Sequence, residues 1–146
     1  MNSRGVTLVE LLVVFVIIAI AATLMVPNIG AWLPSYRLRS ATRDVVSILR
    51  TAQIRAVSTN TTYGVCFGAN SCQLYRGPDP EGEPVDLPTG VQLTNNTFPV
   101  NGALGKPFAQ FNPDSTSSGG GVTLQNTKGT TRRISLTTAT GRVSAP

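Results

Sequence analysis

A single carboxylate, that of Glu10, lies within a long apolar stretch near the start of the sequence. Residues 6–26 contain no other charged residue and no Gly or Pro. As a helix with a rise of about 1.5 Å per residue, this stretch reaches roughly 30 Å, the thickness of a bilayer's hydrocarbon core. Such a helix is apolar on every side and needs lipid or protein around it. A carboxylate inside it is costly, so we expect Glu10 to have a function and a partner.

The residues before this stretch indicate proteolytic processing. A secretory signal carries its small residues after the apolar stretch, whereas Gly5 stands directly before it and Glu10 is the fifth residue after that glycine. The segment 4–12, RGVTLVELL, resembles the processing site of type IV prepilins and pseudopilins. The resemblance implies cleavage by a prepilin peptidase between Gly5 and Val6 and methylation of Val6, although this family usually has Phe at that position. An ordinary signal anchor with a stray carboxylate is the alternative.

Cleavage would supply a partner for Glu10. The new N-terminal residue, Val6, would carry a free ammonium group, which Glu10 of a neighbouring subunit could bind within a bundle of apolar helices. Removing one member of such a pair leaves an uncompensated buried charge, at a cost of about 3–5 kcal/mol. The pair would therefore set the register of a filament. The variant Glu10→Ala is expected to be processed but poorly incorporated.

Two cysteines, Cys66 and Cys72, lie on either side of a turn-like segment, 68–71, in a predicted hairpin. Cysteines on the two arms could face each other and close a disulfide, which fits an oxidising compartment such as the periplasm. A pair of free buried thiols is the alternative. The sequence has no further Cys and no His to complete a metal site, so we predict neither a metal nor a cofactor.

A second helix is expected over residues 35–58, where apolar residues recur every three or four positions. They form one narrow stripe that should pack on a sheet: Leu38, Ala41, Val45, Leu49, Ala52 and Ala56. Arg39, Arg43 and Arg50 fall together on the opposite face of this helix. These arginines form either a solvated face or a contact for acidic partners or phosphate.

The rest of the chain is expected to form short strands. The pattern predicts them at 61–67, 72–76, 91–94, 108–111, 122–125 and 132–137, with an acidic loop at 77–88 and a flexible loop at 112–121. Pro27 should end or kink the first helix. The predicted organisation is a leader (1–5), a transmembrane and assembly helix (6–27), the amphipathic part of the N-terminal helix (28–60) and a β-rich domain (61–146).

Basic residues flank the apolar stretch on both sides, so the positive-inside rule does not orient it. We let the leader and the cysteines orient it instead, with the N-terminus inside and the domain, whose cysteines suit the periplasm, outside. We therefore expect a single-pass protein of the bacterial inner membrane, with its globular domain in the periplasm.

Several segments of the helix and of the chain's end carry a further resemblance. Segments 38–41, 49–56, 111–115, 132–137 and 141–143 are similar to the minor pilins and pseudopilins of the GspH/FimT family. The resemblance implies an α+β, type IV pilin-like fold, in which a long N-terminal helix packs on antiparallel β-sheets. It also implies a subunit that helps to initiate or cap a type IV pilus or a type II secretion pseudopilus, with other pilins as partners. The sequence does not choose between these two filaments.

The residue types do not favour an enzyme. There is no His, four of the seven acidic residues lie in the loop 77–88, and no nucleophile–base pair can be assembled.

DNA binding is the alternative function. Some FimT-like minor pilins end in a Gly-Arg-x-Arg motif that contacts DNA, whereas residues 141–144 read Gly-Arg-Val-Ser and lack the second Arg. Four basic residues near the end of the chain could supply the charge that phosphate binding needs: Lys128, Arg132, Arg133 and Arg142. A basic hairpin that is simply solvated is the competing interpretation.

Overall fold

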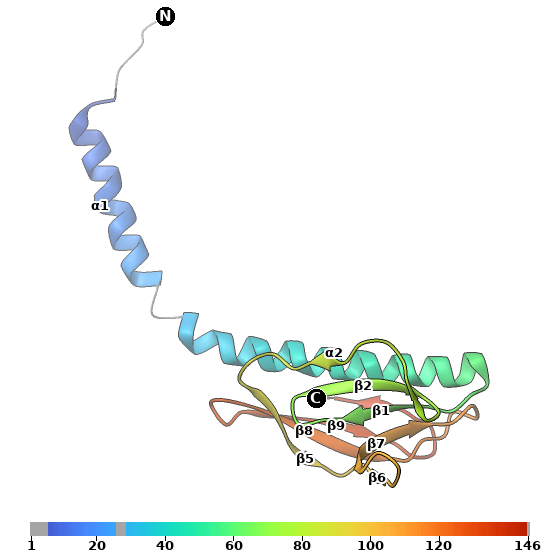
Figure 1. The fold of residues 1–146 in the computed structure, drawn as a ribbon. Helices are drawn as coiled ribbons and strands as arrows, with labels where there is room; N and C mark the ends of the chain where they lie inside the picture. Colours follow the sequence, from blue (N-terminus) through green and yellow to red (C-terminus); the bar gives the residue numbers. More distant parts are fainter. Residues whose placement is uncertain (1–5, 26–28, 146) are drawn as a thin grey trace, which may run out of the picture. The chain divides into compact units, whose positions relative to one another are not determined.

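The computed structural model of the protein describes residues 6–25 and 29–145 (Figure 1). The chain forms two compact units, one ending at Leu33 and the other beginning at Pro34. The first unit contains helix α1 (Leu8–Met25), and helix α2 (Ile29–Thr59) crosses the boundary. The predicted leader and the predicted break at Pro27 lie outside the described residues.

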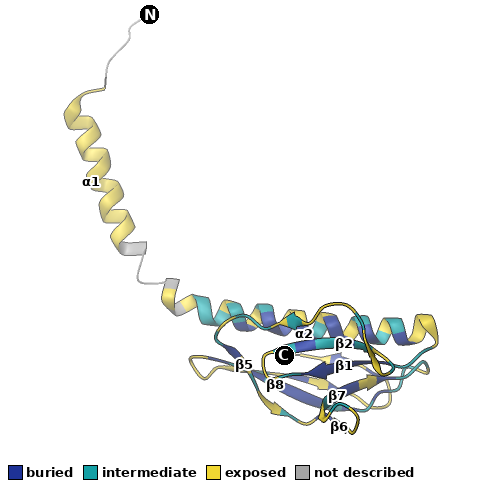
Figure 2. Cartoon of the chain, in the orientation of Figure 1, coloured by how far each residue is buried: buried dark blue, intermediate teal, exposed yellow. Residues whose placement is uncertain are grey.

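Helix α1 has an apolar and exposed surface (Figure 2). Every described side chain from Leu8 to Thr23 is exposed, and Leu8 itself is 80% accessible. The helix begins two residues later than the predicted segment 6–27, whose last two residues lie outside the described part of the chain. Within the described ranges, no helix is long and apolar enough to cross a membrane.

The second unit is built around the apolar stripe of α2, as the sequence predicts. All six residues of the stripe are at most 1% exposed: Leu38, Ala41, Val45, Leu49, Ala52 and Ala56. Figure 2 shows these buried positions recurring along one side of the helix. The helix ends where Asn60 takes a positive φ of 50° and the N–H of Thr61 donates to the carbonyl of Ala56 at 3.2 Å. This is a Schellman-type C-cap, which suits Asn.

The strands form two antiparallel sheets. In the first, the order is β3-β2-β1-β7-β6 with β4 also paired to β2; in the second, it is β10-β9-β8-β5. The strands are β1 (Tyr63–Phe67), β2 (Ser71–Arg76), β3 (Asp79–Pro80), β4 (Val85–Asp86), β5 (Val91–Asn96), β6 (Val100–Asn101), β7 (Lys106–Phe111), β8 (Gly120–Asn126), β9 (Thr131–Leu136) and β10 (Val143–Ser144). The predicted α+β fold, with a long helix packed on antiparallel sheets, is confirmed.

One core joins α2 to both sheets. It contains Leu49 of the helix, Val65 and Phe67 of β1, and Leu124 and Ile134 of the second sheet, all at most 2% exposed. Because residues from both sheets belong to the same core as the helical stripe, burial positions the two sheets against α2.

Two predicted loops contain regular structure. The acidic loop 77–88 includes the two short strands β3 and β4, both paired to β2. The end of the predicted flexible loop 112–121 belongs to β8, which begins at Gly120. The rest of that loop is held by hydrogen bonds, among them the donation from the Thr116 hydroxyl to Asp114 at 2.6 Å. The strand itself was predicted at 122–125, but its glycine-rich start was not, because Gly is usually a weak strand former.

Candidate functional site

The candidate assembly site lies at the start of α1. Gly5 is outside the described residues, and Val6 precedes the helix and is exposed. The N–H of Glu10 donates to the hydroxyl of Thr7 at 3.3 Å, so Thr7 is the N-cap of α1. Glu10 thus lies in the first turn, where the positive end of the helix dipole favours a carboxylate. Thr7 was not predicted from the sequence, although the spacing Thr-x-x-Glu is the known capping-box signal.

The register of the first hairpin corrects the predicted disulfide. In the β1–β2 ladder Cys72 lies opposite Phe67, whereas Cys66 lies opposite Gln73. Residues directly opposite each other share a face of the sheet, and consecutive residues point to opposite faces. Cys66 and Cys72 therefore point to different faces, and both are free thiols. The hairpin was predicted correctly, but its cysteines do not face each other.

The two thiols are buried and chemically quiet. Cys72 belongs to the central core, where burial, and next the charge of Cys66, raise its pKa to about 12. Burial also raises the pKa of Cys66, against an opposing effect of Lys106. Thiols with raised pKa values carry little thiolate and are poor nucleophiles and ligands. No group of three or more metal-ligating side chains occurs in the described part of the chain.

The four basic residues predicted near the C-terminus do not share one surface. Lys128 lies in the turn between β8 and β9, and Arg142 just precedes β10. Arg132 and Arg133 are neighbours on β9, so their side chains point to opposite faces of the sheet. Arg132 is on the face of buried Ile134, which packs against α2, whereas Arg133 is on the outer face and exposed.

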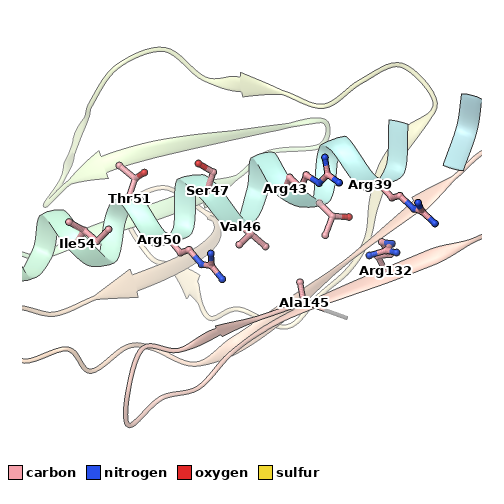
Figure 3. A pocket seen from close by; sticks show the side chains of 10 residues that line it. Arg39, Arg43, Val46, Ser47, Arg50, Thr51, Ile54, Arg132 and Ala145 are labelled. Carbon is pink, nitrogen blue, oxygen red and sulfur yellow. The ribbon is translucent and has the colours of Figure 1, made fainter. Parts of the chain in front are cut away.

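Arg132 instead lines the same hollow as the three arginines of α2. A hollow of about 720 Å³ between α2 and the start of β9 is lined by Arg39, Arg43, Arg50 and Arg132 (Figure 3). Val46, between Arg43 and Arg50, and Ile54, beyond Arg50, supply apolar surface, and no acidic residue is among the described residues that line the hollow. We call this hollow the basic groove. The three helical arginines were predicted from the sequence to share one face, but their proximity to Arg132 was not predicted.

The acidic loop lies against another side of α2. Glu81, which follows β3, forms an ion pair with Arg55. At 100° per residue, Arg55 is about 120–160° around the helix from Arg39, Arg43 and Arg50. The acidic loop and the basic groove are therefore on different flanks of the same helix.

The fold resembles that of a solved minor pilin. The crystal structure of the type IV minor pilin FimU of Pseudomonas aeruginosa PAO1 superposes with a TM-score of 0.57, at 14% sequence identity, over 77% of this chain and 90% of that one. The long helix packed on two antiparallel sheets, together with this likeness, defines a type IV pilin-like fold.

Two family models and one relative narrow the class of protein to a family within this fold. Residues 41–140 match the family described as "Type II transport protein GspH", and residues 1–26 match the "Prokaryotic N-terminal methylation motif". The chain is 29% identical over 122 residues to the type II secretion system protein H of Xanthomonas campestris pv. campestris, covering 83% of this chain and 70% of that protein. The chain belongs to the GspH family of prepilin-like minor pilins and pseudopilins, as the sequence resemblance implied.

Proposed function

We propose that the protein is a membrane-anchored pseudopilin that enters the filament of a type II secretion system and helps to initiate or cap it. The observation that carries this proposal is the exposed apolar helix α1 with Glu10 in its first turn, directly after the methylation motif. An apolar surface of this extent needs an apolar partner. The membrane holds the helix before assembly, and the helices of neighbouring subunits hold it afterwards.

Processing creates the group that Glu10 needs. We propose that a prepilin peptidase cuts between Gly5 and Val6, after which the amino group of Val6 is methylated. Methylation preserves the positive charge of an amine, so Val6 remains able to pair with a carboxylate. Mass spectrometry of the N-terminal peptide of the mature protein tests this step directly: the expected peptide begins with methylated Val6, and a peptide that begins with Met1 contradicts it.

The filament itself is identified by cross-linking in the protein's own cells. The membrane fraction is treated with a cross-linker, the protein is purified, and its partners are identified by mass spectrometry. Capture of type II secretion pseudopilins supports the proposal, whereas capture of type IV pilins would move the protein to the pilus. Capture of neither would leave Glu10 without a neighbouring subunit and would contradict the assembly role.

DNA binding by the C-terminal hairpin is the second function to test, and its support is weaker. Phosphate contacts gain affinity when several cations act together. Arg132 and Arg133 point to opposite faces, so they cannot contact one phosphate backbone in the same way. Titration of the detergent-solubilised protein against DNA at rising salt measures this binding. The hypothesis requires affinity that falls steeply with salt and falls again in Arg133→Ala and Arg142→Ala.

A further inference from the structure

We propose that the basic groove is a docking site for an acidic loop of a neighbouring pilin-like subunit. The proposal rests on the proposed function, because the occupant is a subunit of the same filament. It adds the surface of the globular domain that makes the contact and the chemistry of the segment that fills it.

The groove concentrates positive charge from two elements that are distant in the sequence. Arg39, Arg43 and Arg50 are exposed on α2 and extend over about 16 Å of helix. Arg132 closes the other side from β9, on the face where Ile134 is buried. Arginine forks bind carboxylates through two parallel hydrogen bonds. The spacing therefore suits a segment that carries several carboxylates along its length.

Among the described residues, none of the three helical arginines forms an ion pair with an acidic residue of its own subunit. Between described residues, the one ion pair closer than 4 Å is that of Arg55 with Glu81. Like charges held together oppose the folded state unless an anion joins them. A surface of this kind gains stability when a subunit with acidic residues docks on it.

The residues that line the groove favour a peptide over nucleic acid. Val46 lies between two of the arginines, Ile54 lies beyond Arg50, and Ala145 lines the β-side. A peptide segment with apolar and acidic side chains matches both kinds of surface, whereas a phosphate backbone matches only the arginines. The described residues that line the groove include no aromatic side chain on which bases could stack.

This chain shows what such a segment looks like. Its acidic loop, 77–88, exposes Asp79, Glu83 and Asp86 on the side of α2 where Arg55 forms its ion pair with Glu81. A subunit with an acidic loop on one flank and a basic groove on another makes heterologous contacts, and such contacts build open helical filaments. A related neighbour with an equivalent loop would therefore be complementary to this groove.

Site-specific photo-cross-linking in the protein's own cells tests the proposal. A photoreactive amino acid is placed at Ser47 in the groove, at Val100 on β6 as a control surface, and at Leu12 on α1 as a reporter of filament contacts. All three side chains belong to exposed residues. From Ser47, the captured peptides are expected to come from an acidic segment of another pilin-like subunit. From Val100, the yield of that segment is expected to be at background.

Charge reversal within the groove tests the role of its arginines, and charge reversal outside the groove is the control. The double variant Arg43→Glu/Arg50→Glu should lower the Ser47 yield about tenfold, which corresponds to ~1.4 kcal/mol of binding free energy. Arg133→Glu makes one such charge reversal on the outer face of β9 and should leave the yield unchanged. Circular dichroism of each purified full-length variant checks that it folds.

The Leu12 reporter separates the two possible failures. If Leu12 captures pilin-like subunits but Ser47 captures nucleic acid, lipid or an acid-free segment, the docking proposal is overturned and the proposed function remains. An equal Ser47 yield from the charge-reversed variant also overturns the docking proposal. If Leu12 captures no pilin-like subunit, the proposed function fails and the docking proposal fails with it.

Discussion

Cys72 lies directly opposite Phe67 in the β1–β2 ladder, one residue out of step with Cys66. Because the side chains of a strand alternate between faces, this offset places the thiol of Cys72 in the core and that of Cys66 on the other side of the sheet. Cβ vectors that point apart cannot be bridged by a disulfide without backbone movement. The hairpin therefore keeps two separate thiols even in an oxidising compartment.

The first prediction follows from this register. After purification without reductant and unfolding in denaturant, both Cys66 and Cys72 should react with a thiol reagent. In the native protein near neutral pH, Cys72 should react far more slowly than after unfolding, because burial keeps it protonated and shielded. The variants Cys66→Ala and Cys72→Ala assign each reaction to its residue. If neither cysteine reacts in the unfolded, unreduced protein, the two thiols are joined in a disulfide and this prediction is wrong.

A second prediction concerns stability at alkaline pH. The pKa of Cys72 is about 12 in the folded protein, against an ordinary value of 9.0. In the unfolded state the thiol loses its proton near pH 9, whereas in the folded state it keeps it. The stability gained from the neutral buried thiol is therefore fully present below pH 9 and is lost as the pH rises from 9 towards 12.

Thermal unfolding of matched variants isolates this effect from the titration of Tyr and Lys. The Tm advantage of the natural protein over Cys72→Ala should shrink as the pH is raised through this range. Cys66→Ala should show a smaller change, because Lys106 offsets part of the effect of burial on Cys66. An advantage that stays constant with pH would mean that Cys72 does not titrate differently in the two states.

A third prediction concerns Gly121 in β8. A Cβ atom at this position would lie 2.8 Å from the carbonyl oxygen of Ile134 and 3.5 Å from Cα of Ser135, both on the paired strand β9. Backbone atoms cannot move aside without disturbing the ladder, so Gly121→Ala should destabilise the domain by about 1–3 kcal/mol. Chemical denaturation measures the difference in the free energy of unfolding.

Gly102 provides the matched control, because a Cβ atom there meets nothing within 4 Å. Gly102→Ala should therefore be neutral or slightly stabilising, since it restricts mainly the unfolded chain. Equal effects of the two substitutions would show that the close approach of β8 to β9 at Gly121 does not limit the side chain.

The sequence predicted the parts of this protein that depend on local periodicity. The stripe from Leu38 to Ala56 has the spacing of a helix, and a helix with one apolar side must bury it. The disulfide was predicted wrongly because a hairpin's register depends on the geometry of its turn, and a shift of one residue reverses every side chain. The proximity of Arg132 to the arginines of α2 could not be predicted, because it depends on how β9 packs against a helix far away in the sequence.

The fourth prediction separates two roles of Glu10, one in the helix cap and one in assembly. The hydrogen bond from the N–H of Glu10 to Thr7 stabilises the start of α1 without using the carboxylate. Thr7→Ala removes this cap, at a typical cost of about 1 kcal/mol, and leaves the charge in place. Glu10→Ala removes the charge and leaves the cap. If the carboxylate binds the amino group of a neighbouring Val6, only the second change leaves a buried ammonium unpaired.

Both variants should be processed normally, because neither alters the peptide bond between Gly5 and Val6. Glu10→Ala should be largely missing from sheared or cross-linked filaments, whereas Thr7→Ala should be incorporated nearly as well as the natural protein. Glu10→Gln keeps the shape of the side chain and should behave like Glu10→Ala, since the charge is what the amine requires. If Thr7→Ala were excluded as strongly as Glu10→Ala, helix capping rather than charge pairing would explain the need for these residues. Normal incorporation of Glu10→Ala would remove the charge pair from the assembly mechanism altogether.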